Sequence, residues 1–251
     1  MPVASEGAVA AGEVVLSVES VSRRFGGLTA VDDVSLQLAA GAMTAVVGPN
    51  GAGKTTLFNL LTGQLRPSSG DVRFRGERIT DRKPHDRARM GIGRTFQIVR
   101  PLEALTVMEN AMVGAFARHR RRRAAMERAG EVLETLGLYH RRDVLASSLT
   151  LAERKRMEIA RALGSDPQVL LLDEVMAGLN PVETDAAIEI VRRLNEGGLT
   201  VLLIEHDLKV VRTLAEHAIV LDGGREIAAG TPAEVFADPA VIEAYLGVKS
   251  A

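Results

Sequence analysis

The glycine-rich segment at residues 48–55 constrains the possible folds of this chain more than any other feature. Its sequence, GPNGAGKT, matches the pattern GxxxxGK[ST] and lies between a strand-like run at 44–47 and a helix-like run at 56–61. Glycines let a backbone wrap closely around phosphate oxygens, and the following helix adds unpaired N–H groups and the positive end of its dipole. The segment therefore predicts a phosphate-binding loop; a glycine-rich turn that binds nothing is the disfavoured alternative.

The polar side chains of this loop predict its chemistry. Lys54 is expected to reach the β and γ phosphates of a nucleotide, and the Thr55 hydroxyl is expected to bind Mg²⁺. The predicted nucleotide-binding residues of the segment are Gly48, Pro49, Asn50, Gly51, Ala52, Gly53, Lys54, Thr55 and Thr56.

Short apolar runs and helical patterns follow one another along the chain. We predict strands at residues 14–18, 43–47, 169–172 and 200–204. Two of these runs are apolar almost throughout, which is typical of parallel strands buried on both faces. Between residues 98 and 164 the strand pattern disappears and the sequence becomes helical in character. These patterns predict a three-layer α/β core with an inserted helical subdomain.

Two carboxylates, Asp173 and Glu174, follow the third predicted strand, where ligands bind in open α/β sheets. Asp173 is expected to hold Mg²⁺ through water, and Glu174 to orient or deprotonate the water that attacks the γ phosphate. Because side chains alternate along a strand, the two point in different directions and can serve the metal and the nucleophile separately. An exposed acidic loop is the alternative, and the phosphate loop disfavours it.

Residues 94–97 (RTFQ) and 204–207 (IEHD) add to these motifs, and the whole order resembles the ABC ATPase family across residues 13–250. The resemblance implies that Gln97 contacts Mg²⁺ and the attacking water, and that His206 hydrogen-bonds the γ phosphate of ATP. It also implies that Phe25 stacks on adenine, with a core position as the alternative. ATP and Mg²⁺ are thus the expected cofactors, and Glu174, His206 and Gln97 the expected catalytic residues.

The same resemblance implies the architecture. We expect an α/β P-loop NTPase (RecA-like) core in residues 13–97 and 165–230, with an N-terminal antiparallel β subdomain. Residues 98–164 would form the helical subdomain and residues 231–250 a C-terminal helical extension. Residues 1–12 lack the features of a secretory signal and are predicted to be a disordered tail.

Residues 149–153 (LTLAE) depart from the LSGGQ signature with which the family caps the ATP of the opposite subunit. Thr150 keeps a hydroxyl, Ala152 adds a methyl group where glycine allows close approach, and Glu153 adds a negative charge. Thr150 and Ala152 are the expected nucleotide contacts of a weakened clamp, so the partner's nucleotide is expected to be hydrolysed more slowly. Thr150 and Glu153 also form a capping box that predicts a helix over residues 152–163.

Residues 177–180 (AGLN) replace the more frequent SALD at the dimer seam, and Asn180 is expected to contact nucleotide with its remaining oxygen acceptor. Residues 174–181, together with residues 241–247 (VIEAYLG), resemble the ATPase subunits of branched-chain amino acid uptake systems. A sister group that imports urea or short amides is the alternative.

Composition and resemblance together predict the partners. The formal net charge of −1 shows no footprint for nucleic acid, the absence of cysteine excludes a thiolate metal site, and no apolar run is long enough to span a bilayer. The resemblance implies a peripheral protein on the cytoplasmic face of the inner membrane, bound to membrane-spanning permease subunits. It implies dimerisation with a second ABC ATPase, identical or related, and indirect coupling to a solute-binding protein.

Three other classes are disfavoured. A soluble ABC ATPase of DNA repair or translation typically carries two cassettes or a long coiled-coil insertion, which this chain lacks. A P-loop GTPase or kinase leaves Glu174 and His206 unexplained, and a non-hydrolysing cassette conflicts with the intact Lys54 and Asp173. The basic block at residues 118–123 is interpreted as a solvated surface, with contact to anionic lipid as the alternative.

Overall fold

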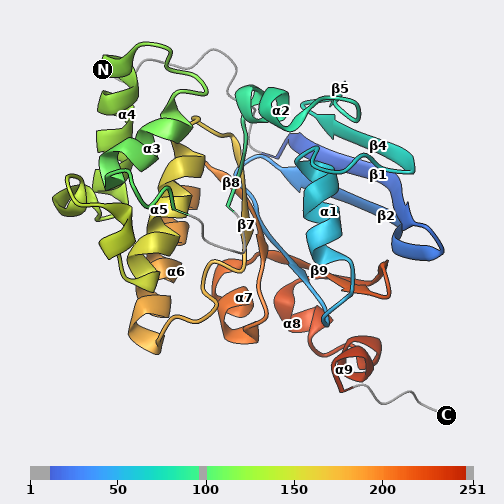
Figure 1. Cartoon of the computed structure of the whole chain (residues 1–251). Helices are drawn as coiled ribbons and strands as arrows, with labels where there is room; N and C mark the ends of the chain where they lie inside the picture. The colour runs from blue at the N-terminus through green and yellow to red at the C-terminus, as the bar shows by residue number, and fades with distance from the viewer. Residues whose placement is uncertain (1–11, 96–100, 247–251) are drawn as a thin grey trace.

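A mixed β-sheet forms the centre of the fold in the computed structural model, which describes residues 12–95 and 101–246 (Figure 1). In sheet order its described strands are β10 (Arg225–Gly230), β9 (His217–Asp222), β3 (Met43–Val47), β8 (Thr200–Ile204), β7 (Val169–Asp173) and β6 (Ile92–Arg94). β10 is antiparallel to β9, and the other neighbours pair in parallel. Every residue of β3, β7 and β8 is buried, as their apolar sequences predict.

A second, antiparallel sheet contains the N-terminal strands. Its order is β2 (Leu28–Ala39), β1 (Val14–Phe25), β4 (Ser69–Phe74) and β5 (Glu77–Arg78). β1 and β2 form a hairpin in which Phe25 pairs with Leu28. Gly26 at its turn has a φ of 58°, which glycine adopts without steric cost. The sheet corresponds to the predicted antiparallel β subdomain.

Helix α1 (Lys54–Leu61) packs in the core between the two sheets. Its side chains at Leu57, Phe58, Leu60 and Leu61 are fully buried and share one hydrophobic cluster with both sheets. Side chains alternate along β7, so this strand contributes to two hydrophobic clusters: Leu171 faces α1, and Leu170 and Leu172 face the opposite side. The central sheet is therefore covered on both faces, as a three-layer α/β core requires.

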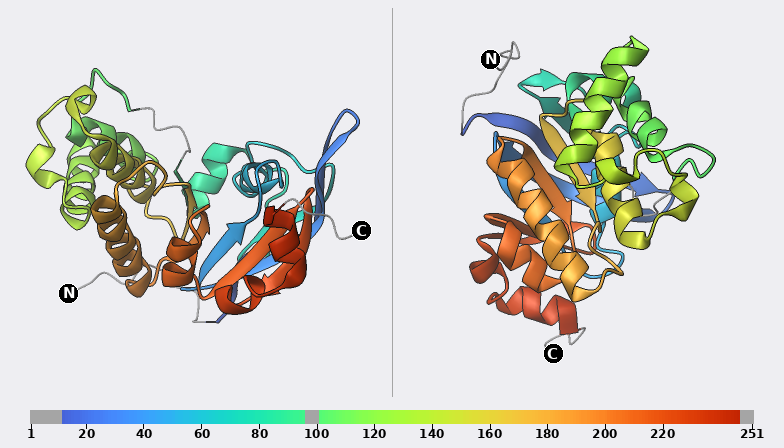
Figure 2. Two further views of the ribbon diagram at one scale, coloured as in Figure 1. Left: turned by 90° about the horizontal axis from the view of Figure 1, so that it is seen from below. Right: turned by 90° about the vertical axis from the view of Figure 1, so that its left-hand side faces the viewer.

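The second hydrophobic cluster joins the other face of the central sheet to a group of helices. They are α3 (Val107–Ala115), α4 (Arg122–Thr135), α5 (Leu151–Leu163), α6 (Pro181–Glu196) and α7 (Leu208–Leu214). Figure 2 shows α3, α4 and α5, in green to olive, on one side of the molecule, away from the two sheets. Short 3₁₀ turns at Tyr139–Arg141 and Ala146–Ser148 connect α4 to α5.

The other helices of the described residues are α2 (Pro84–Met90), α8 (Pro232–Val235) and α9 (Pro239–Leu246). The last two follow β10 and lie near the C-terminus (Figure 1). A search of the described part of the chain finds no helix long and apolar enough to cross a bilayer.

The predicted α/β fold class is confirmed, and each predicted strand lies inside an observed strand. β1 continues to Phe25, well past residue 18, because the β1–β2 hairpin supplies partners for its polar second half. Residues 1–11 lie outside the described residues, so the predicted tail stays a prediction.

The basic block at residues 118–123 lies between α3 and α4, and most of it is exposed. His119 pairs with Asp166, Arg123 pairs with Glu127 one turn further along α4, and Arg118 donates to the Arg89 carbonyl oxygen. These contacts favour the interpretation as a solvated surface.

Candidate nucleotide-binding and hydrolysis site

The register of the central sheet brings the predicted motifs together at one edge. Val46 of β3 pairs with Ile204 of β8, which in turn pairs with Asp173 of β7. The carboxyl ends of these three parallel strands are therefore level. The phosphate loop follows β3, Glu174 follows β7, and residues 205–206 follow β8. This edge is where ligands bind in open α/β sheets.

The phosphate loop has a shape that requires glycine at two positions. Gly48 has a φ of 144°, and a Cβ there would lie 2.0 Å from the Leu221 carbonyl oxygen. Gly53, the residue before α1, has a φ of 99°, and a Cβ there would lie 2.4 Å from the Ala30 carbonyl oxygen. Any side chain at either position forces a backbone to move.

Lys54 lies across the loop that precedes it. Its Nζ donates to the carbonyl oxygens of Gly48 at 2.7 Å and Pro49 at 2.9 Å. Burial lowers the pKa of Lys54, and the negative charges of Glu174 and Asp173 oppose that effect. The ammonium group thus lies at the start of α1, where the dipole of the helix favours anions.

A cleft of about 380 Å³ opens beside the loop. It is lined by Phe25, Leu28, Ala30, Asn50, Gly51, Ala52, Gly53, Lys54, Thr55, Thr56, Glu174 and His206. Phe25 is 42% exposed, and the Arg23 guanidinium carbon lies 4.7 Å from its ring centroid. A core position for Phe25, the alternative interpretation, is therefore wrong; stacking on adenine stays a prediction.

Asp173 is buried beneath this cleft. Its Oδ2 accepts a hydrogen bond from Arg94 Nη2 at 2.9 Å, whereas its Oδ1 has no hydrogen-bond partner among the described residues. Burial raises the pKa of Asp173, and the hydrogen bond and charge of Arg94 oppose this effect. A buried carboxylate oxygen with free lone pairs fits Mg²⁺, which needs few protein ligands because phosphates and water complete its shell, and the exposed Thr55 hydroxyl has the chemistry of a second ligand. The described residues contain no cluster of three or more acidic or histidine side chains that could hold a metal alone.

Glu174 and His206 are in direct contact. His206 Nε2 and Glu174 Oε1 form a short hydrogen bond across the cleft. Glu174 has a φ of 51°, a left-handed conformation that costs a non-glycine residue energy. Its backbone N–H donates to the Ile204 carbonyl oxygen at 3.0 Å, which anchors it to β8.

Sequence reasoning gave no role to Lys155 and Glu205, which lie behind the cleft. Lys155 Nζ, from α5, donates to the Glu174 carbonyl oxygen at 2.9 Å. Glu205 Oε1 accepts a hydrogen bond from the Met176 backbone N–H at 3.0 Å, and burial raises the pKa of Glu205 to about 7. These bonds connect α5 and the residue after β8 to the turn that carries Glu174. The available signal was a charged residue directly after the buried strand at 200–204.

Thr150 and Asn180 are not part of this cleft. Each begins a helix through a complete capping box, with Thr150 and Glu153 on α5 and Asn180 and Glu183 on α6. The predicted box at Thr150 is therefore confirmed, and its helix begins one residue earlier than predicted. The Glu153 carboxylate also pairs with Arg141 at 3.3 Å, so its charge has a partner within the subunit.

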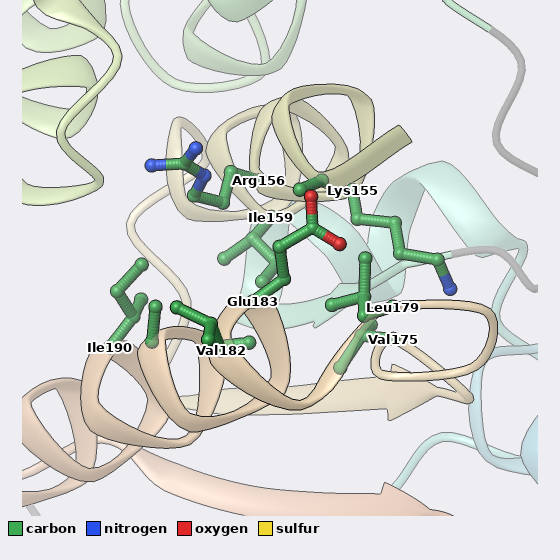
Figure 3. A pocket seen from close by; sticks show the side chains of 11 residues that line it. Lys155, Arg156, Ile159, Val175, Leu179, Val182, Glu183 and Ile190 are labelled. Carbon is green, nitrogen blue, oxygen red and sulfur yellow. The ribbon is translucent and has the colours of Figure 1, made fainter. Parts of the chain in front are cut away.

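Ala152 faces the interior rather than the surface expected of a clamp residue. It is 8% exposed and lines a pocket of about 150 Å³ between α5 and α6. Figure 3 shows Ile159 of α5 facing Val182 and Ile190 of α6 across this hollow. Ala152 is buried and the charge of Glu153 has a partner within the subunit, and a weaker clamp stays a prediction.

Gln97 lies outside the described residues, so its predicted role stays a prediction. The adjacent Arg94, which the sequence analysis named only as part of the RTFQ segment, contacts Asp173 and also donates to Asn59 Oδ1 at 2.6 Å. A cationic side chain at the end of β6 thus connects α1 to the buried carboxylate.

The fold has a three-layer α/β core, and its phosphate loop with Lys54 is level with the two carboxylates. These features define a P-loop NTPase. Comparisons with known proteins narrow this class. The ABC transporter family profile matches residues 31–177, and a profile described as branched-chain amino acid ATP-binding cassette transporter matches residues 225–251. The chain belongs to the ABC transporter family and is an ATP-binding, ATP-hydrolysing cassette.

Several curated relatives match almost the whole chain. The high-affinity branched-chain amino acid transport ATP-binding protein BraF of Pseudomonas aeruginosa is 41% identical, covering 93% of this chain and 98% of the relative. LivG of Escherichia coli K12, which bears the same description, is 40% identical with the same coverage. A probable LivG of Archaeoglobus fulgidus is 36% identical over 94% of this chain and 96% of its own length.

Solved structures agree with this family. A nucleotide-free ATP-binding cassette of an ABC transporter superposes with a TM-score of 0.86 and is 33% identical, covering 95% of this chain and 100% of its own. A cassette in its ADP conformation gives the same TM-score at 34% identity, covering 94% of this chain and 100% of its own.

Proposed function

We propose that this chain is the ATP-hydrolysing subunit of an importer for branched-chain amino acids. The observation that carries the proposal is the match of nearly the full chain to transport ATP-binding proteins of that description, including the C-terminal profile over residues 225–251. The cleft supports the chemical half of the proposal, since it brings Lys54, Glu174 and His206 together.

Each residue of the cleft has a role in this proposal. Lys54 binds the β and γ phosphates, and the open ring of Phe25 stacks on the adenine. Glu174 orients and deprotonates the attacking water, while His206 hydrogen-bonds the γ phosphate and holds the Glu174 carboxylate. Asp173, Thr55 and Gln97 would hold Mg²⁺, and the bound ion would supply positive charge against the charge that develops on the phosphates.

The active form in this proposal is a dimer with a second cassette. Thr150, Ala152 and Asn180 do not line the cleft of their own subunit, and the capped N-terminus of α5 has the chemistry to bind an anion. The side chains of Thr150 and Asn180 and the backbone N–H of Ala152 contact the ATP of the partner cassette, so ATP joins the two subunits and hydrolysis releases them. This cycle drives a pair of membrane-spanning permease subunits from the cytoplasmic face of the inner membrane.

Affinity purification of the Glu174→Gln form with MgATP, from solubilised native membranes and from the soluble fraction, tests the assembly. We expect two polytopic membrane proteins and a second cassette to co-purify from the membranes. Recovery of soluble ribosomal or nucleic-acid partners alone overturns the transport assignment while leaving the ATPase intact.

Reconstitution of the recovered assembly in proteoliposomes tests the solute. With the cognate solute-binding protein outside, we expect ATP-driven uptake of leucine, isoleucine or valine, and none in the Lys54→Ala form. Uptake of urea or short amides in their place contradicts the proposed solute and supports the sister group.

A further inference from the structure

The C-terminal helix α9 contacts the phosphate loop through one hydrogen bond. The backbone N–H of Gly48 donates to the Tyr245 hydroxyl oxygen at 2.9 Å, across 197 positions of sequence. α9 follows α8 near the C-terminus, packs against β10, and has no other assigned role in the site (Figure 1). The contact therefore joins the last described helix directly to the first residue of the loop.

Gly48 is the position where the regular pairing of the central sheet ends. Val46 is the last residue of β3 paired with β8, and Val47 is the last paired with β9. The next residue, Gly48, has no room for a side chain against the Leu221 carbonyl oxygen. Its N–H donates to Tyr245 and its carbonyl oxygen accepts from Lys54, so side chains bind both of its backbone polar groups.

These two contacts respond differently to nucleotide. The Lys54 ammonium has three N–H donors and uses two of them on loop carbonyl oxygens, so binding to both the β and the γ phosphate takes it from one of these carbonyls. The Gly48–Tyr245 bond involves the other side of the residue and can persist. It then holds the start of the loop whichever carbonyl oxygen Lys54 gives up.

We propose that Tyr245 is a positioning residue for nucleotide, whose hydroxyl fixes the first residue of the phosphate loop while Lys54 moves to the phosphates. Burial raises the pKa of Tyr245, so its hydroxyl stays neutral and adds no charge beside a triphosphate. The inference depends on the ATPase and not on the transported solute, so its test is independent of the transport assay.

The test compares Tyr245→Phe with Tyr139→Phe in the full-length chain. The chain has two tyrosines, and they are matched in exposure, at 37% for Tyr245 and 36% for Tyr139. Tyr139 lies between α4 and α5, where its ring packs against Arg142, and it does not line the nucleotide cleft. Each variant loses a single hydroxyl group.

We expect Tyr245→Phe to raise the Kd and the KM for MgATP by about threefold to tenfold, the effect of one neutral hydrogen bond. Because Tyr245 does not touch the reacting atoms, kcat should stay within about twofold. Amide hydrogen exchange at Gly48 should accelerate, while exchange in the rest of β3 and the Tm stay near wild-type values. Tyr139→Phe should change none of these quantities.

Three results overturn the inference. Unchanged exchange at Gly48 shows that the bond is absent in solution. Accelerated exchange with unchanged Kd and KM shows that the loop does not depend on the bond. A lowered Tm with faster exchange throughout β3 shows that Tyr245 only stabilises the fold.

Discussion

At the scale of single residues, Glu174 combines backbone strain with several anchors. Its left-handed backbone costs about 1–3 kcal/mol for a non-glycine residue, and its neighbours compensate for this cost. Ile204 holds its N–H, Lys155 holds its carbonyl oxygen and His206 holds its carboxylate. The carboxylate therefore has a fixed direction toward the cleft before any ligand binds.

The proposed role of Glu174 as general base predicts a selective loss in Glu174→Gln. The amide keeps the size of the side chain but cannot accept a proton, so ATPase activity should fall by about 100-fold or more. MgATP affinity should stay within about threefold of wild type. Phosphate release and nucleotide titration measure the two quantities, with the exposed Glu216→Gln as control. A fall of less than about tenfold contradicts the role.

Glu205 predicts a dependence of stability on pH. Its pKa is about 7 in the fold against an ordinary value of 4.5, so the protonated form is favoured in the native state. The stabilisation of the native state by protonated Glu205 is fully present below pH 4.5 and is lost as the pH rises through 7. The loss amounts to about 3 kcal/mol, with an uncertainty of about 1 kcal/mol.

Denaturant unfolding of wild type and Glu205→Gln between pH 5 and 8 measures this effect. Glutamine keeps an oxygen acceptor for the Met176 N–H and cannot titrate. The variant should therefore gain stability relative to wild type as the pH rises, whereas Glu216→Gln should follow wild type. Parallel profiles for wild type and Glu205→Gln refute the prediction.

At the scale of elements, local sequence starts several helices in the same way. Thr106 and Glu109 begin α3, Thr150 and Glu153 begin α5, and Asn180 and Glu183 begin α6, each through a complete capping box. These boxes satisfy backbone N–H groups that a helix leaves unpaired. On α5 and α6 the capping residues are also the proposed nucleotide contacts.

A comparison of two caps separates the structural role of Thr150 from its functional one. Thr150→Ala and Thr106→Ala remove equivalent hydroxyls, and each should lower the free energy of unfolding by about 1 kcal/mol. Only Thr150→Ala should also lower the ATPase activity of the assembled dimer, because Thr106 caps α3 and is not a proposed nucleotide contact. Equal activities of the two variants show that Thr150 acts only as a cap.

At the scale of the whole molecule, the proposed site is divided between two surfaces. The phosphate loop and the carboxylates lie at one edge of the central sheet, whereas the N-terminus of α5 belongs to the helical group beside it (Figure 2). The pocket between α5 and α6 leaves these two helices loosely packed near Ala152. A division of this kind makes hydrolysis depend on how two cassettes meet.

If the partner cassette carries the LSGGQ signature, we predict that the two nucleotides of the heterodimer are hydrolysed at unequal rates. In the proposed dimer the LTLAE segment caps the partner's ATP, so that nucleotide should turn over more slowly than the one bound here. Separate replacement of Glu174 and of its counterpart in the partner, followed by ATPase measurement, tests this asymmetry. Since Glu153 is paired with Arg141 and Ala152 is buried, equal losses from the two replacements would assign both residues to the structure of the subunit alone.

The sequence by itself determined the fold class and the motifs of the site. The phosphate loop could be predicted from the sequence because glycine at Gly48 and Gly53 is a local steric requirement. Helix α5 could be predicted because its cap and its apolar periodicity lie within a few residues. Buried strands such as β7 were readable from their continuous apolar runs. All of these signals arise from neighbours in sequence.

Only the tertiary structure decided the contacts between distant segments. The partnership of Arg94 with Asp173, of Lys155 with the Glu174 carbonyl oxygen, and of Tyr245 with Gly48 depends on the register of the sheet and on helix packing. The raised pKa of Glu205 likewise follows from burial, which its position after a strand does not fix. Such contacts form because the hydrophobic clusters on both faces of the sheet fix the positions of these polar groups. The number of residues between two such groups does not predict how far apart they lie in the fold.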